Sequence, residues 1–490
     1  MTSPIVTEPT PAVADRLDES TDGRSAVSDA VERGPRAART SAPRPAGRQA
    51  SLFRVVWRWH FYAGVVVTPV LVIMSVTGGL YVFRSEIEGL ANGHLTSVVP
   101  QGERIPYRAQ FGAAVAAFPE MRPMSVQIPA EPDKATVVTL QERKRPSDGS
   151  TGGRRTRGDS VNVYIDPYSG TVIGNLHSAE DAVGPFFNAV LSIHRTLFLG
   201  TTGRVMTELC TGWTVLLLAT GLYLWWPRNR NSKGVWTPRW RAKRYTLLRD
   251  LHSVAGMYLL PITGVIAVTG MFYTLVVGKV IHDAAHYSVG ETGEGRGGDR
   301  RDRGRQRSAE PEPVPFATGP SLDQVVANVR KAYPDRSIWV SLSSRRGGDL
   351  RVSAGNDFNN TWGPYVSTDF TLDKQEGRIT GQKHLSEGEF FWHGWTYPLH
   401  VGSVMGIWSK VLWFAACIVL TALPITGLWM WWQRRPRGRS GLPRRPDAQL
   451  PRWLIALVGL LCVLMPVVGA SVLLFAAIDG GSRLIRRRFA

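Results

Sequence analysis

The chain has 490 residues, of which 43% are hydrophobic, and a formal net charge of +19 at pH 7. A basic protein can bind nucleic acid, but here the basic residues gather in the connections between apolar stretches, as in the cytoplasmic loops of membrane proteins. The composition therefore favours membrane lipid as a partner and excludes nucleic acid.

Apolar stretches that could cross a bilayer alternate with polar segments along the chain. A helix needs about 20 apolar residues to cross roughly 30 Å of hydrocarbon. The first 50 residues are rich in Ala, Pro, Ser and Arg, which predicts a disordered cytoplasmic tail at 1–50. We then expect transmembrane helices at 52–84, 204–226, 251–277, 405–432 and 453–477. Between them lie external domains at 85–203 and 278–404 and cytoplasmic loops at 227–250 and 433–452.

The arginine-rich connections predict the orientation. Both loops and the tail before the first span are strongly basic, and such segments stay in the cytoplasm. We therefore expect a multi-pass protein of the cytoplasmic (inner) membrane with a cytoplasmic N-terminus. The course of the chain after the fourth span stays open, because Pro466 would allow 453–477 either to cross once or to bend back.

The sequence contains an internal repeat. HFYAGVVVTPVLVIMSVTG, from His60, aligns without a gap with HSVAGMYLLPITGVIAVTG, from His252, at a shift of 192 residues. A shift of 206 aligns His194 with His400, and a shift of 207 aligns IDPYSGTVIG with LDKQEGRITG. The repeated unit is thus a span, an external domain and a second span, made twice in parallel. The fifth span has no counterpart.

The external segments have the patterns of small α+β domains. VNVYIDPYSGTVIG alternates into an Asp-Pro turn and out again, as a β-hairpin does, and residues 321–334 have the apolar spacing of a helix. The predicted fold is therefore an α-helical membrane bundle of about five transmembrane helices, built as a tandem repeat, with two small α+β extracytoplasmic domains.

Four histidines occupy equivalent places in the repeat. His60 and His252 begin outgoing spans near the cytoplasmic face, while His194 and His400 precede the incoming spans on the external side. Ionisable side chains in a membrane are costly and are therefore candidates for function. A structural zinc site normally uses four protein ligands, whereas haem brings four nitrogens of its own and needs two axial ligands. We predict that each pair supplies the axial ligands of one haem iron, giving two haems.

Two glycines and two further histidines accompany these pairs. Gly64 and Gly256 follow the inner histidines at i+4, where a missing side chain would leave room for a flat ring. Close helix packing is the alternative explanation for each glycine. His94 and His286, also equivalent in the repeat, are weaker candidates for outer ligands or substrate contacts, and exposed loops would explain them equally well.

The motifs resemble those of the PepSY-associated transmembrane family. They are His-x-x-Ala-Gly, a Thr-Gly span ending, His-Arg-Thr-Leu-Phe-Leu-Gly and Thr-Gly-Leu-x-x-Trp-Trp, and YIDPYSGTVIG is similar to the PepSY module. The resemblance covers roughly 52–435. It implies transmembrane histidines that bind b-type haem and, as in ferric-siderophore reductases, reduction of chelated iron outside the cytoplasmic membrane. The second copy departs from the pattern, because HVGSVMG places Val401 where the first copy has Arg195.

Three functions are compatible with these features. The first is a haem-dependent membrane oxidoreductase that passes electrons from a cytoplasmic or quinol donor to an external ferric chelate. A separate donor is expected because no Gly-x-Gly-x-x-Gly fingerprint opens a strand-to-helix turn. The second is a non-enzymatic membrane-anchored PepSY sensor or binding protein, which predicts no cofactor. The third is a siderophore transporter, which would require polar or charged groups near the middle of the bilayer and interrupted helices.

Overall fold

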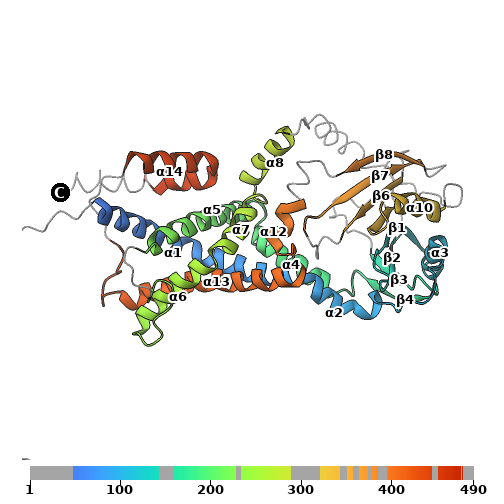
Figure 1. Cartoon of the computed structure of the whole chain (residues 1–490), viewed down its shortest axis with the longest axis horizontal. Coiled ribbons are helices and arrows are strands. Elements are labelled where there is room, and N and C mark those ends of the chain that lie inside the picture. The colour runs from blue at the N-terminus through green and yellow to red at the C-terminus, as the bar shows by residue number, and fades with distance from the viewer. Residues whose placement is uncertain are drawn as a thin grey trace, which may run out of the picture. The chain divides into compact units, whose positions relative to one another are not determined.

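The computed structural model describes residues 48–142, 159–227, 233–288, 321–342, 350–356, 363–373, 378–384, 394–443, 451–475 and 477. The tail at 1–50 was predicted to be disordered. Of this tail only residues 48–50 belong to the described set, and the rest lies outside it. The described residues form long helices and an antiparallel sheet with its own short helices (Figure 1).

Three helices are long and apolar enough to cross a membrane: α1 (Arg48–Val82), α5 (Gly200–Trp225) and α13 (Gly406–Arg434). A fourth span is possible where α6 (Arg244–Tyr258) and α7 (Leu260–Met271) meet at a bend of 66°. Proline cannot donate a backbone hydrogen bond and its ring crowds the preceding turn, so Pro261 is accommodated in the first turn of α7. The first four predicted spans therefore correspond to helices of the structure.

The fifth predicted span is divided into two short helices. Residues 453–477 contain all but the first residue of α14 (Arg452–Leu464) and a second apolar helix, Pro466–Phe475, each too short to cross by itself. The break falls at Pro466, which cannot continue the hydrogen-bond pattern of α14. About five transmembrane helices were expected, whereas the described residues contain three helices that could span a membrane, or four if the bent pair is one span.

The long helices pack on one another and leave apolar side chains on the outside. α1 contacts both α5 and α13, α6 contacts α13, and α7 contacts α5. Val66, Ile73 and Leu80 of α1 and Val411 and Ile418 of α13 are exposed. Surfaces of this kind are covered by lipid in a membrane-spanning bundle.

Short helices lie next to the bundle: α2 (Arg84–Thr96), α4 (Val183–Thr196), α8 (Val277–Ser288) and α12 (Tyr397–Val401). The chain turns sharply between α4 and α5, where Leu197 and Phe198 have positive φ angles of 50° and 58°. Gly203 packs so closely on the carbonyl of Thr196 that a side chain could not fit there. The corresponding corner between α12 and α13 contains Gly402, with φ of 76°.

The strands form one sheet of eight, fully antiparallel, in the order β4-β3-β2-β1-β5-β6-β7-β8. They are β1 (Met121–Ile128), β2 (Thr136–Glu142), β3 (Ser160–Ile165), β4 (Val172–His177), β5 (Ser337–Ser341), β6 (Leu350–Gly355), β7 (Ser367–Leu372) and β8 (Ile379–His384). Helices α3 (Tyr107–Ala117) and α10 (Leu322–Ala332) pack against the sheet's buried residues. The predicted hairpin is β3–β4, and the predicted helix is α10.

The two segments predicted to be external share this sheet instead of folding as two separate domains. β1 of the first segment pairs with β5 of the second, with Val126 opposite Val340 and Ile128 opposite Ile338. An unpaired β1 would expose a row of backbone donors and acceptors, and pairing with β5 satisfies them. The buried side chains of both halves also form a single hydrophobic core. The prediction of two independent α+β units is corrected to two four-stranded halves of one sheet.

The seam between the halves gives a test of this shared core. Ile338 is fully buried, so Ile338→Ala should destabilise the sheet by about 2–5 kcal/mol, the usual cost of truncating a core side chain. Amide hydrogen exchange of the full chain should then be faster in both β1 and β5. The neighbouring Trp339→Ala is the control, because Trp339 is 50% exposed on the opposite face. Faster exchange in β5 alone would contradict a core shared across the seam.

Candidate functional site

The helices bring the four repeat-equivalent histidines together as two pairs. His60 of α1 lies beside His252 of α6, with 6.5 Å between the ring centroids and 82° between the ring planes. His194 of α4 lies beside His400 of α12, at 6.3 Å and 57°. Each pair contains one histidine from each half of the chain. These are the inner and outer pairs that the sequence predicted.

A threonine of a neighbouring helix holds each inner histidine. The Nδ1 atom of His60 lies 2.9 Å from the hydroxyl of Thr220 on α5, and Nδ1 of His252 lies 3.0 Å from the hydroxyl of Thr426 on α13. Both hydroxyls also donate to a carbonyl one turn back in their own helix. With its hydrogen used in this way, each threonine oxygen can accept a hydrogen bond from the imidazole.

The outer histidines are held in the same way, with a backbone carbonyl in addition. Nδ1 of His194 lies 3.1 Å from the hydroxyl of Thr77 and 3.0 Å from the carbonyl of Met74, both on α1. Nδ1 of His400 lies 3.2 Å from the hydroxyl of Thr269 and 3.1 Å from a carbonyl of α7. A carbonyl can only accept, so these Nδ1 atoms are the donors.

These hydrogen bonds decide which nitrogen of each ring remains available. A neutral imidazole carries its hydrogen on one nitrogen and a lone pair on the other. Because Nδ1 carries the hydrogen in this arrangement, Nε2 carries the lone pair. A hydrogen bond to the remote ring nitrogen fixes the tautomer and orientation of a metal-binding histidine in the same manner. All four rings are thus prepared to bind a metal through Nε2.

A glycine follows each of these threonines and gives the histidine ring room. A Cβ atom added at Gly78 or Gly270 would come 3.3 or 3.2 Å from Cε1 of His194 or His400. One added at Gly221 or Gly427 would lie 3.4 or 3.7 Å from Cε1 of His60 or His252. We call each Thr-Gly dipeptide with its histidine a cradle. The four cradles are Thr77-Gly78 for His194, Thr220-Gly221 for His60, Thr269-Gly270 for His400 and Thr426-Gly427 for His252.

These Thr-Gly pairs were not among the site residues predicted from the sequence. The repeated motifs contain all four pairs, but room for a flat ring was predicted beside Gly64 and Gly256. In the structure a Cβ atom added at Gly64 would meet nothing within 4 Å, and one added at Gly256 would lie 3.5 Å from the side chain of Leu423. That these two glycines make room for a flat ring stays a prediction. The signal that could have found the cradles is the recurrence of Thr-Gly at the same shifts of 192 and 206 residues as the histidines.

Two further histidines were predicted as weaker candidates. His94 is exposed on α2, and no contact places it beside either pair. His286 belongs to the last turns of α8, where its side chain lies outside the described residues. The described residues contain no group of three or more His, Cys, Asp and Glu side chains arranged as a metal-ion site.

The two pairs lie at opposite ends of the same helix. Thr77, which holds His194, follows His60 by 17 residues along α1, about 26 Å at the helical rise of 1.5 Å per residue. This separation approaches the hydrocarbon thickness of a bilayer, roughly 30 Å. One pair therefore lies near each face of the region that a membrane would cover.

The geometry of each pair suits two axial ligands of one metal. Two imidazoles that bind a metal from opposite sides have ring centres roughly 6 Å apart, because each metal–nitrogen bond is about 2 Å long and each ring centre lies about 1 Å beyond its nitrogen. Both measured separations agree with this value. Haem would need no further protein ligand at either place, since it supplies the other four nitrogens. The residues present therefore fit haem at both pairs.

Aromatic and basic side chains surround the outer pair. The ring of Tyr273 lies 5.6 Å from that of His400 and 6.4 Å from that of Tyr397. Tyr397 is hydrogen-bonded to Tyr81, whose hydroxyl also accepts from Arg84 at 2.9 Å. These side chains connect the outer pair with the start of α2.

The cradle hydrogen bond gives a testable requirement for the inner pair. Thr220→Val keeps the shape of the side chain but leaves Nδ1 of His60 without its hydroxyl acceptor. Loss of such a contact typically weakens metal binding 10–100-fold, so the purified variant should retain less haem, and Thr220→Ser should restore it. Thr214→Val is the control, because Thr214 donates to the carbonyl of Cys210 in the same helix. Equal haem loss from the Thr214 and Thr220 variants would contradict a specific role of the cradle.

Comparison with protein families supports the identification of these motifs. The family model of the PepSY-associated TM region matches residues 57–434, a range that contains all four histidines and all four cradles. A search of the curated proteins found no match. The match covers most of the chain, and its helices are long and apolar enough to cross a bilayer. The chain is a membrane protein that belongs to the PepSY-associated transmembrane family.

Proposed function

We propose that the protein is a transmembrane electron carrier that holds two b-type haems and reduces chelated ferric iron, such as a ferric siderophore, outside the cytoplasmic membrane. In this proposal the chain is a tandem duplication, and each haem lies between the two copies. The enzyme class is a haem-dependent membrane oxidoreductase, with a cytoplasmic or quinol electron donor.

The observation that carries the proposal is the repeated hydrogen bonding of the histidines. All four rings use Nδ1 for a threonine or a carbonyl and keep Nε2 for another partner. A histidine that only filled space at the membrane interface would not need the same tautomer in four places. Metal binding explains why the same cradle surrounds every ring.

The residues of the chain would hold and separate the two redox sites. When bound, haem supplies one-electron chemistry, and the protein controls its ligation, burial and access. The histidines would fix each site between the two copies, and the threonines would orient the imidazoles. The length of α1 between His60 and Thr77 would place one site near each face of the bilayer.

The outer side chains suit an anionic ferric chelate. Arg195, which follows His194, is exposed, whereas the guanidinium of Arg84 beside the Tyr81 hydroxyl is already paired with Glu88 at 2.7 Å. Guanidinium groups bind carboxylate and phenolate oxygens, and tyrosine rings offer flat surfaces for aromatic chelators. The second copy has Val401 in place of this arginine, so we expect the chelate to approach from the Arg195 side.

Two other functions are less well supported. A membrane-anchored PepSY sensor or binding protein could use the exposed face of the sheet around Trp339. That function does not explain why the same cradle occurs at all four histidines. A siderophore transporter could use the break between α6 and α7, because transporters place binding sites at discontinuous helices. His252 and Thr269 on the two halves of this pair are, however, already engaged in the inner and outer cradles.

Haem content and histidine variants test the proposal. The purified chain, expressed with adequate haem, should show a Soret band and approach two haems per chain. His60→Ala or His252→Ala should remove one haem and leave external reagents able to reduce the other, and His194→Ala or His400→Ala should spare the inner haem. His94→Ala is the control, since His94 lies apart from both pairs. A chain without a Soret band, or four variants with wild-type haem content, would refute the redox function.

Cysteine labelling tests the proposed orientation. After replacement of the three native cysteines, an impermeant thiol reagent should label Lys331→Cys of α10 in intact cells, because the sheet is expected outside. Arg439→Cys should be labelled only after lysis, because it belongs to an expected cytoplasmic loop. Both wild-type side chains are exposed, so accessibility to the reagent depends on the membrane alone. The reverse pattern would invert the topology and the direction of electron flow.

A further inference from the structure

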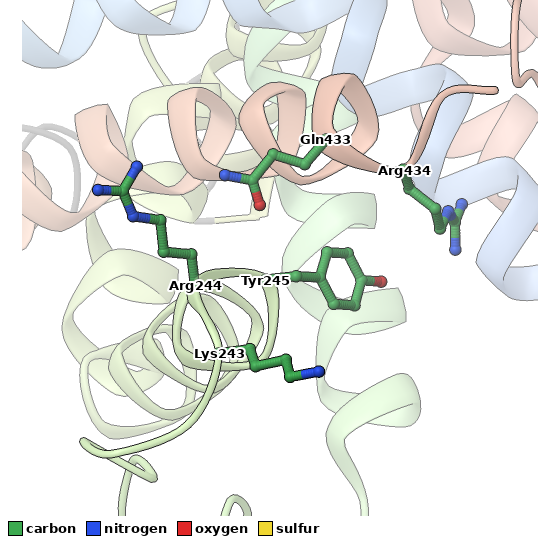
Figure 2. A pocket seen from close by; sticks show the side chains of 5 residues that line it. All are labelled: Lys243, Arg244, Tyr245, Gln433 and Arg434. Carbon is green, nitrogen blue, oxygen red and sulfur yellow. The ribbon is translucent and has the colours of Figure 1, made fainter. Parts of the chain in front are cut away.

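A cavity of about 500 Å³ opens between the start of α6 and the end of α13. Figure 2 shows its five lining side chains, which come from the two helix ends: Lys243, Arg244, Tyr245, Gln433 and Arg434. All five are exposed, so the cavity is accessible from outside the bundle. It is separate from both histidine pairs.

The side chains that line the cavity are positively charged or neutral, and none of them is a carboxylate. Three of its five side chains are cationic and none is acidic. Within the described residues, the ion pairs do not include Lys243, Arg244 or Arg434. The carboxylate of Asp250, further along α6, is already bound by Arg239 and Arg249. Three cations around one space repel one another, and a bound anion would relieve this repulsion.

The position of the cavity places it at the depth of lipid headgroups. Trp57, Trp431 and Trp432 lie at the same ends of α1 and α13, and tryptophans gather at the membrane–water interface. The guanidinium of Arg434 lies 4.7 Å from the centre of the Trp57 ring, which connects the cavity with this aromatic belt. Beyond it, Trp429 and Trp432 expose apolar surface along which acyl chains could lie.

We propose that this cavity binds the phosphate of an anionic phospholipid, such as phosphatidylglycerol, in the cytoplasmic leaflet. Basic pockets between transmembrane helices on the cytoplasmic side are suited to such headgroups. Lysine and arginine would form charge-assisted hydrogen bonds with the phosphate, and Tyr245 and Gln433 would donate to the remaining oxygens. The inference rests on the orientation proposed above and does not depend on haem.

A lipid bound here would join the two helices that form an inner cradle. Tyr245 precedes His252 by seven residues on α6, and Gln433 follows Thr426 by seven on α13. Seven residues are two helical turns, so the cavity lies about 10 Å along the same helix faces from the His252–Thr426 contact. The headgroup would thus stabilise the contact between α6 and α13 at the end where His252 is held.

Lipid binding to the full-length protein tests the proposal. Native mass spectrometry should detect a retained phosphatidylglycerol, and adding this lipid should raise the melting temperature more than phosphatidylcholine does. The variant Lys243→Gln/Arg244→Gln/Arg434→Gln should bind roughly a hundredfold more weakly, since each cation near an anionic surface contributes about fivefold. The three side chains are exposed, so the variant should fold, which its circular dichroism spectrum would verify.

A second triple variant controls for general charge attraction. Arg241→Gln/Arg437→Gln/Arg439→Gln removes the same charge from exposed positions outside the cavity at the same ends of the helices. It should keep the lipid response of the wild type. Equal losses in both variants, or no loss in either, would overturn the site. If inorganic phosphate raised the melting temperature as much as the lipid does, the cavity would be a free-anion site and the lipid assignment would be wrong.

Discussion

A hydrogen bond between a threonine hydroxyl and histidine Nδ1 occurs at four places in the helical bundle and positions each histidine ring. Each cradle joins two helices of the same half, as when Thr220 of α5 holds His60 of α1. Each histidine pair, by contrast, joins one half to the other. If a cradle moved, the partner histidine would no longer meet its counterpart across the interface. At Gly78 and Gly270 an added Cβ atom would crowd the imidazole at 3.3 and 3.2 Å, so the absence of a side chain there is a packing requirement of the site.

The sheet joins the same two halves at a second place. Pairing of β1 with β5 continues the strand order from one half into the other, and Asp323 of α10 accepts hydrogen bonds from backbone amides at the start of α3. Because a four-stranded half would leave β1 exposed as an edge, the shared sheet stabilises both halves together. The halves thus meet in the bundle through imidazoles and in the sheet through backbone pairing.

Polar groups inside the bundle are satisfied by partners from distant parts of the sequence. The ammonium of Lys410, only 1% exposed on α13, donates to Ser85 at 2.8 Å and to Glu86 at 2.6 Å. The buried carboxylate of Glu208 on α5 accepts from the backbone amides of Val276 and Val277, just before and at the start of α8. A buried charge is tolerated only with such partners, so these contacts fix where α2 and α8 begin.

The sequence by itself indicated the apolar helices α1, α5 and α13, the α6–α7 pair, the β3–β4 hairpin and the α10 helix, because these depend on local hydropathy, periodicity and turn residues. It also indicated which histidines pair, because an alignment of the two halves places them at equivalent positions. Only the tertiary structure decided that the Thr-Gly pairs adjoin the histidine rings, since that depends on which helix faces His60 or His194. It also decided that the two external segments form one sheet, because backbone hydrogen bonds between β1 and β5 leave no pattern in the side chains.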